Sequence, residues 1–364
     1  MDKGKKKRKR RYLILLLAVL LAVSALIIYV CIDKSNNPFI VQLSDGGMVI
    51  TGYQGFSREI DIPDEIDSVY VIAIGDRAFA DNKRITSISM PDSVTSIGEG
   101  VFSNCSSLEQ IKLSLNIEEI CNNTFLNCKS LEKVVLPDGV ETVGAMAFCG
   151  CTALNDIKLS ANLVSVGEYT FSECQSLESI NLPEGLLSIC NGAFSRCYVL
   201  ESITIPDDIQ TICEDTFSEC TSLKDVELSD SVKTIEKNAF LNCKSLEYID
   251  LSSVESVGNS AFMYCFGLDE ISLSESMVII EERAFYCCKS LKELVLPDIG
   301  IVIKPGAFGN CISLSRIIMP PNVNLQKSDA FYGCPNVVIY GKEGSFAETY
   351  AKERKIPFVS YIFK

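Results

Sequence analysis

The chain has 364 residues, 47% of them hydrophobic and 22% charged, and 33 Lys and Arg against 47 Asp and Glu give a net charge of −14. This apolar content can offset the entropy of ordering the chain, so the composition excludes an intrinsically disordered protein. The chain contains no histidine. It therefore lacks the commonest general base and the commonest metal ligand, and every Ser-His or Cys-His catalytic pairing is excluded.

The N-terminus combines a basic tail with an apolar stretch. Residues 1–11 hold eight Lys and Arg, and residues 12–32 (YLILLLAVLLAVSALIIYVCI) follow without a charge. As a helix this stretch would be about 31 Å long, which matches a hydrocarbon core of about 30 Å. We therefore expect residues 12–32 to form a transmembrane helix, an uncleaved signal anchor. A cleaved signal peptide is the alternative, but its apolar region is normally shorter and ends at small residues.

The charge pattern predicts the orientation of this anchor. The positive-inside rule places residues 1–11 in the cytoplasm and the rest of the chain outside the cell, as a single-pass membrane protein. Once the eight bases and one acid of residues 1–32 are subtracted, 25 bases and 46 acids remain, a net charge of −21. Such a surface repels phosphate backbones, so nucleic acid is not expected as a partner.

From residue 70 to 340 the sequence repeats. Ten of the eleven intervals between the marking phenylalanines are 23 residues long and one is 22; the positions are Phe79, Phe102, Phe125, Phe148, Phe171, Phe194, Phe217, Phe240, Phe262, Phe285, Phe308 and Phe331. Apolar residues 9 and 11 positions after each Phe from Phe79 to Phe308 alternate with variable ones, as in a short strand with one buried face. One unit cannot bury its own apolar side, but stacked units can. The period predicts a repeat solenoid of about 12 turns of 22–23 residues, with a parallel β ladder of one strand per turn.

The repeat unit also resembles a known family. AFSRCYVLESITIPDDIQTIC, at residues 193–213, is similar to the BspA-type leucine-rich repeat of bacterial and protozoan surface proteins. The resemblance covers residues 70–340 and implies adhesion to host matrix, host cells or other microbes. It also implies a linker and N-terminal β cap in residues 33–69 and a helix-strand cap in residues 341–364. In the latter, Ser345 and Glu348 have the spacing of a capping box for a helix through about Lys355.

Eleven of the 17 cysteines lie three residues after a repeat Phe: Cys105, Cys128, Cys151, Cys174, Cys197, Cys220, Cys243, Cys265, Cys288, Cys311 and Cys334. Equivalent positions of a solenoid lie above one another, so we expect a ladder of inward-facing thiols that behave as small hydrophobes. A disulfide framework is the alternative, because the chain is expected outside the cell. Parallel Cβ vectors, however, keep neighbouring Cβ atoms farther apart than the bridge distance of about 3.8 Å. No CxxC pair occurs, so no metal, cofactor or catalytic site is expected.

Function is therefore expected on the outward strand positions, 8 and 10 residues after each Phe. Most of them are polar, but the C-terminal third holds residue types that anchor protein interfaces, namely Tyr248, Val295, Arg316 and Ile318. Tyr264 and Phe266 flank the one shortened repeat. Scattered surface apolar residues are the alternative interpretation. We expect these six residues to bind a partner.

The sequence thus favours a non-enzymatic, membrane-anchored surface protein that binds a protein or glycan ligand on a host or microbial surface. The alternative is an envelope scaffold or spacer that binds resident membrane proteins.

Overall fold

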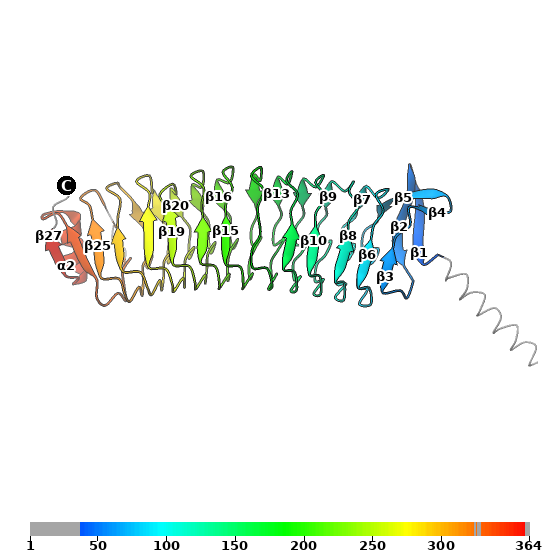
Figure 1. Cartoon of the computed structure of the whole chain (residues 1–364). Coiled ribbons are helices and arrows are strands. Elements are labelled where there is room, and N and C mark those ends of the chain that lie inside the picture. The colour runs from blue at the N-terminus through cyan, green and yellow to red at the C-terminus, as the bar shows by residue number, and fades with distance from the viewer. Residues whose placement is uncertain (1–36, 324, 326–328, 361–364) are drawn as a thin grey trace, which may run out of the picture.

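The computed structural model describes residues 37–323, 325 and 329–360. They form a long, nearly straight rod, with the first strands at one end and the only described helix at the other (Figure 1). The expected cytoplasmic tail (1–11) and transmembrane helix (12–32) lie outside the described residues. Within the described part, no helix has the length and apolar character to span a membrane.

The rod begins with a small β cap. Strands β1 (Phe39–Ser44) and β2 (Gly47–Tyr53) form an antiparallel hairpin, and β4 (Glu65–Ile66) pairs antiparallel with β5 (Val69–Ile74). Strand β2 also pairs in parallel with β5. The hairpin therefore covers the first coil of the stack.

Most coils contribute strands to two parallel ladders, each of which is divided into several hydrogen-bonded sheets, and residues 179–181 form no strand. The long-strand ladder, formed mainly by three-residue strands, consists of β3 (Glu59–Asp61), β6 (Ser87–Ser89), β8 (Gln110–Lys112), β10 (Lys133–Val135), β12 (Asp156–Lys158), β15 (Ser202–Thr204), β17 (Asp225–Glu227), β19 (Tyr248–Leu251), β21 (Glu270–Leu273), β23 (Glu293–Val295), β25 (Arg316–Met319), β26 (Val338–Gly341) and β27 (Phe358–Ser360). The short-strand ladder follows β5 with β7 (Ser96–Ile97), β9 (Glu119–Ile120), β11 (Thr142–Val143), β13 (Ser165–Val166), β14 (Ser188–Ile189), β16 (Thr211–Ile212), β18 (Thr234–Ile235), β20 (Ser256–Val257), β22 (Ile279–Ile280) and β24 (Val302–Ile303).

The result is a parallel β-solenoid of about 13 turns. Two expectations need correction. The predicted single strand per turn is wrong, because the segment before each Phe from Phe102 to Phe308 forms a second, two-residue strand. An additional coil precedes the first Phe, since β3 pairs with β6 and β5 pairs with β7 in the manner of a repeat. That coil lacks the Phe and Cys that mark the others, which is why the period did not include it.

The core of the rod is a stack of aromatic rings. The twelve repeat phenylalanines are all buried, and neighbouring rings from Phe79 to Phe331 lie 5.0–5.7 Å apart between centroids with interplanar angles of 25° or less. Each ring therefore covers the ring of the previous coil. Phe39 and Tyr53 of the N-terminal hairpin and Tyr350 of the C-terminal helix contact the two ends of the stack. The end rings are thus shielded from water by the caps.

Backbone conformation around each Phe adds a third strip of hydrogen bonds. In eleven of the twelve Phe coils the residues two before and two after the Phe have positive φ, as for Gly192 (63°) and Arg196 (61°) around Phe194. The amide groups of this triplet donate to carbonyl oxygens of the next coil, with Phe194 N lying 2.9 Å from Thr216 O. A left-handed residue with a side chain costs about 1–2 kcal/mol. The inter-coil hydrogen bonds and the buried ring offset this cost.

The C-terminal end closes with α2 (Phe346–Arg354) and β27, which pairs with β26. Ser345 is the N-cap residue, but neither hydrogen bond of the expected capping box is formed. The Glu348 carboxylate accepts from the Gly344 amide at 2.7 Å, whereas the Ser345 hydroxyl donates to the Lys342 carbonyl instead of capping the helix. The Ser345 hydroxyl therefore stabilises the turn before the helix, whereas the sequence pattern predicted that it would cap the helix.

The ring stack leads to a prediction about stability. Truncation of a central ring by Phe194→Ala should lower the free energy of unfolding by about 3–5 kcal/mol, because it leaves a cavity between two rings. Phe56→Ala is the matched control, since Phe56 is 78% exposed and its truncation should cost less than about 0.5 kcal/mol. Urea denaturation followed by circular dichroism measures both. Equal stabilities of the two variants would contradict the role of the stack.

Candidate binding surfaces

The cysteine ladder does not supply a reactive site. All eleven ladder thiols are buried, and all sixteen described cysteines are free. Each ladder Sγ donates to the carbonyl oxygen of the Phe one coil earlier, for example Cys197 Sγ to Phe171 O at 3.2 Å. Among the described residues, no cluster of acidic residues and cysteines could hold a metal ion. The thiols therefore link one coil to the next.

Burial also suppresses the reactivity of these thiols. It raises the pKa of Cys105 and of Cys197 from 9.0 to about 12, and it raises the pKa of Cys128, Cys174 and Cys220 well above 9.0. A thiol must lose its proton to act as a nucleophile or a metal ligand. At neutral pH these five side chains remain protonated donors to the Phe carbonyl groups.

Charge is distributed unevenly along the rod. Residues 37–279 carry 13 Lys and Arg against 37 Asp and Glu, a net charge of −24, whereas residues 280–364 carry 11 against 8, a net charge of +3. We call the latter the C-terminal part. Several bases of the acidic region form ion pairs between neighbouring coils, such as Arg196 with Glu173 at 2.9 Å. Of these two regions, the acidic one therefore carries the net charge that repels anions, and the C-terminal part does not.

The structure separates the six predicted site residues into two surfaces. Tyr248, Val295, Arg316 and Ile318 lie on the long-strand ladder, where Tyr248 and Val295 are exposed while Arg316 and Ile318 are half-buried. Tyr264 and Phe266 lie in the turn after Phe262, away from that ladder. Tyr248 is further removed from the other three ladder residues, because β21 lies between β19 and β23.

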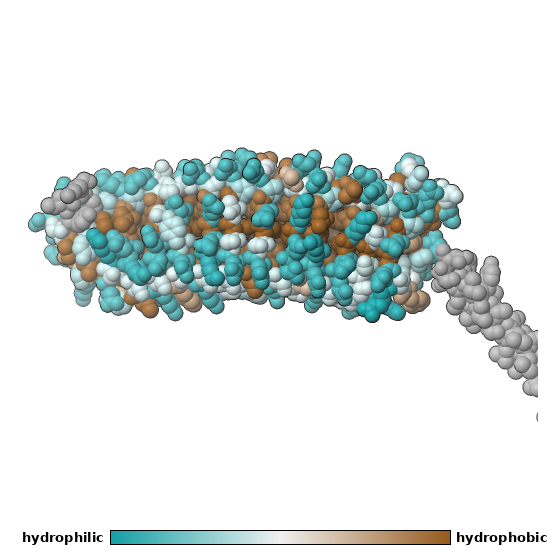
Figure 2. All heavy atoms as spheres, viewed as in Figure 1, coloured by the Kyte–Doolittle hydropathy of each residue, from teal (hydrophilic) through white to brown (hydrophobic). Residues whose placement is uncertain are grey.

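On the ladder, Val295 and Ile318 belong to a longer row. Val295 pairs with Ile318, Ile318 with Tyr340, and Tyr340 with Val359 in successive parallel strands. We call these four residues the sheet-face row. Arg316 lies beside it, with its guanidinium 5.1 Å from the centroid of the Tyr340 ring and 3.5 Å from a Glu293 oxygen. Its Nε is buried and has no hydrogen-bond partner among the described residues. Figure 2 shows brown, apolar residues along the middle of this face of the rod, with teal residues on both sides.

In the turns, Tyr264 and Phe266 belong to a chain of four rings. Ring centroids are 5.9 Å apart between Phe266 and Tyr264, 6.0 Å between Tyr264 and Tyr286, and 6.0 Å between Tyr286 and Tyr332. We call these four residues the aromatic patch. The Tyr286 hydroxyl accepts from the Asn310 amide at 2.6 Å. Glycines make room for the last two rings, because a Cβ at Gly309 would lie 2.9 Å from Tyr332 and 3.0 Å from Tyr286.

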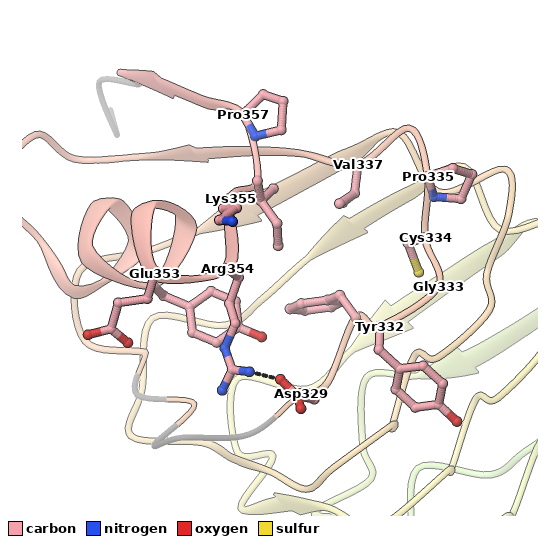
Figure 3. Close-up of a pocket in the computed structure, with 13 residues that line it drawn as sticks. Asp329, Tyr332, Gly333, Cys334, Pro335, Val337, Glu353, Arg354, Lys355 and Pro357 are labelled. Carbon is pink, nitrogen blue, oxygen red and sulfur yellow. Dashed lines mark ion pairs between the residues drawn. The ribbon is translucent and has the colours of Figure 1, made fainter.

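A pocket of about 490 Å³ lies between the last Phe turn and helix α2 (Figure 3). Val337, Cys334 and Pro335 line one side, and Glu353, Arg354 and Lys355 at the end of α2 line another. Arg354 forms an ion pair with Asp329 across the pocket and lies 5.8 Å above the ring of Tyr350. The pocket therefore contains no array of unsatisfied polar groups that would define a ligand.

Reasoning from the sequence missed Tyr340, Val359, Tyr286 and Tyr332. Tyr340 and Val359 lie in the closing segment, whose register with the repeats is not visible from the period. Tyr286 and Tyr332 could have been found, because each lies one residue after a repeat Phe and one residue before the turn position that holds Gly or Asn in many coils. The prediction included Tyr264 and Phe266 beside the shortened repeat but did not extend to the turns of the following coils.

Comparisons with known proteins agree with the fold. The family model of the BspA type leucine-rich repeat region matches the chain over residues 72–200, 144–268, 188–299 and 252–340. A leucine-rich repeat protein from Bacteroides ovatus ATCC 8483 is similar, with 25% identity and a TM-score of 0.61 over 90% of this chain and 99% of that chain. A leucine rich cell surface protein from Faecalibacterium prausnitzii A2-165 has 28% identity and a TM-score of 0.56 over 90% and 97%. No curated protein matches the chain.

The raised thiol pKa values predict that stability falls at alkaline pH. Unfolded thiols release their protons above pH 9, whereas Cys105 and Cys197 keep theirs to about pH 12 in the fold. Above pH 9 the unfolded state therefore binds fewer protons than the folded state. The stabilisation that each buried thiol contributes is fully present below pH 9, and above it the free energy of unfolding falls by about 1.4 kcal/mol per thiol and pH unit.

Urea denaturation at pH 7, 8 and 10 measures this loss. The variant Cys105→Ala/Cys197→Ala is the control, and its stability should depend less steeply on pH than that of the parent chain. The interpretation is wrong if stability is the same at pH 8 and 10, or if parent and variant have the same slope.

Proposed function

The chain belongs to the BspA-type leucine-rich repeat family, and from that premise we propose that it is a membrane-anchored cell-surface protein whose C-terminal part binds a protein or glycan partner in adhesion. Repeat proteins of this kind are generally structural or binding proteins rather than enzymes. One similar solved structure is described as a cell surface protein. Both facts support a binding role outside the cell.

Anchoring is supported by the sequence of the N-terminus. Residues 12–32 have the length and apolar character of a membrane span, and the eight bases of residues 1–11 favour a cytoplasmic tail. Six residues, 33–38, then separate the proposed span from β1. In this arrangement the N-terminal cap is close to the membrane, and the rod carries the C-terminal part away from it.

The observation that carries the binding proposal is the sheet-face row. Val295 and Val359 are 53% and 42% exposed, and they are joined through Ile318 and Tyr340 into one apolar strip across four strands. Arg316 offers a charged group and an unsatisfied buried Nε beside the strip. An apolar strip with adjacent Tyr and Arg has the composition of an interface centre. Tyr248 remains outside the row.

A paired set of variants tests this role. Val295→Thr/Ile318→Thr keeps β-branched side chains and their strand preference while removing apolar area, so the affinity for the partner should fall about tenfold or more. Val135→Thr is the matched control, because Val135 is 47% exposed and occupies the same repeat position in the acidic region. Cells that display each full-length chain are tested for binding to immobilised basement-membrane matrix.

The outcomes separate the proposed roles. Binding that is lost only with the double variant supports adhesion through the row, and equal binding by all three chains contradicts it. Recovery of the chain only with resident membrane proteins favours a scaffold. Protease treatment of intact cells measures location, and an uncut repeat domain would contradict a cell-surface position.

A further inference from the structure

We propose that the aromatic patch, with Arg283 and Lys289, is a binding site for an anionic glycan that carries carboxylate or sulfate groups. The inference deepens the proposed surface-binding function and rests on it, because it assigns a partner class to a second surface of the C-terminal part. It depends on three observations: a continuous chain of rings, two cations without acidic partners, and the change of charge along the rod.

The rings form one surface over four consecutive coils. Tyr264 is 36% and Tyr332 45% exposed, while Phe266 and Tyr286 are half-buried between and beside them. Each Tyr combines an apolar ring face with a hydroxyl group that can form hydrogen bonds. Sugar rings offer the complementary combination, since their C–H faces pack on aromatic rings and their hydroxyl groups bond to polar tips. The patch is therefore suited to a chain of sugars laid along the turns.

Two cations lie within this surface. The Lys289 ammonium is 4.4 Å from the centroid of the Phe266 ring. Arg283 packs beside Tyr332 over Gly306, where a Cβ would lie 2.9 Å from the Tyr332 ring and 3.7 Å from Arg283 Cγ. Both cations are exposed, and among the described residues neither forms an ion pair with a carboxylate.

This arrangement differs from that of the Phe194 coil. The Phe194 coil also combines a cation and an aromatic residue at turn positions, Arg196 and Tyr198, but Arg196 lies between Glu173 and Glu219 at 2.9 and 3.5 Å. Its charge is therefore already compensated. Arg283 and Lys289 instead leave two positive charges next to rings, and a ligand that brings its own acidic groups would compensate them.

The density of charge favours a glycan over a nucleic acid. Rings with basic residues also bind single-stranded nucleic acid, which carries a phosphate at every nucleotide. Here only two unpaired cations accompany four rings, and the adjoining residues 37–279 have a net charge of −24. A densely charged strand would be repelled by that region, whereas a glycan with occasional acidic sugars can place them at Arg283 and Lys289.

The experiment uses the full-length chain in detergent with four probes: heparin, polygalacturonate, neutral dextran and single-stranded DNA. We expect heparin or polygalacturonate to bind, and binding should weaken about tenfold or more in Arg283→Gln/Lys289→Gln and in Tyr264→Ala/Tyr332→Ala. The matched control is Arg196→Gln/Tyr198→Ala, whose affinity should stay within about twofold of the parent. Arg283→Gln/Lys289→Gln changes only exposed side chains. It therefore tests the patch even if Tyr264→Ala/Tyr332→Ala unfolds a coil.

Several results would overturn the proposal: neither polyanion binds, binding is unaffected by both patch variants, dextran binds equally well, or single-stranded DNA binds more tightly than either glycan. If the chain binds matrix through the sheet-face row but binds neither polyanion, the glycan proposal is contradicted and the proposed function is not. If the chain binds a polyanion at the patch but its repeat domain is protected from protease on intact cells, the cell-surface location is contradicted instead.

Discussion

Every coil of this protein depends on its neighbours, because 23 residues cannot enclose an apolar core. Each Phe ring is covered by the next ring, 5.0–5.7 Å away, and hydrogen bonds along the two ladders and at the Phe turns join neighbouring coils over most of the rod. Stability is therefore a sum of contacts between adjacent coils rather than a property of one central core. The two caps are required for the same reason, since without them the first and last rings would face water.

The cysteines have a defined place in this arrangement. A thiol is small enough to lie beside the ring stack, and its weak donor reaches the Phe carbonyl one coil earlier, for example over 3.1 Å from Cys220 to Phe194. The same carbonyl also accepts a hydrogen bond from the amide of the Cys in its own coil. In this example, Cys197 N donates to Phe194 O at 3.2 Å. The thiol thus fills a second acceptor site that would otherwise be buried without a donor. The interior is occupied by packing and hydrogen bonding, which leaves function to the outer surface.

Much of the fold could be predicted from the sequence, and the candidate sites only in part. The Phe period, the burial of the Cys column and the alternation around residues such as Ile203 follow from repetition, because equivalent residues must occupy equivalent places. The second strand of each coil was missed since a two-residue strand leaves no alternation to detect. The sheet-face row and the aromatic patch depend on which coils become neighbours at the capped end, where Tyr340 and Val359 fall outside the repeat pattern. Position along the rod, rather than residue type, distinguishes these residues from scattered surface side chains.

The central claim is that the cysteines are structural thiols held between coils. The most direct test is to alkylate the full-length chain before and after unfolding without reductant, and to locate the modified residues by mass spectrometry. We predict that the eleven ladder cysteines, from Cys105 to Cys334, stay unmodified in the native chain, and that all 17 cysteines react after unfolding. Labelling of the ladder in the native chain, or a low count after unfolding that reveals disulfides, would contradict this account.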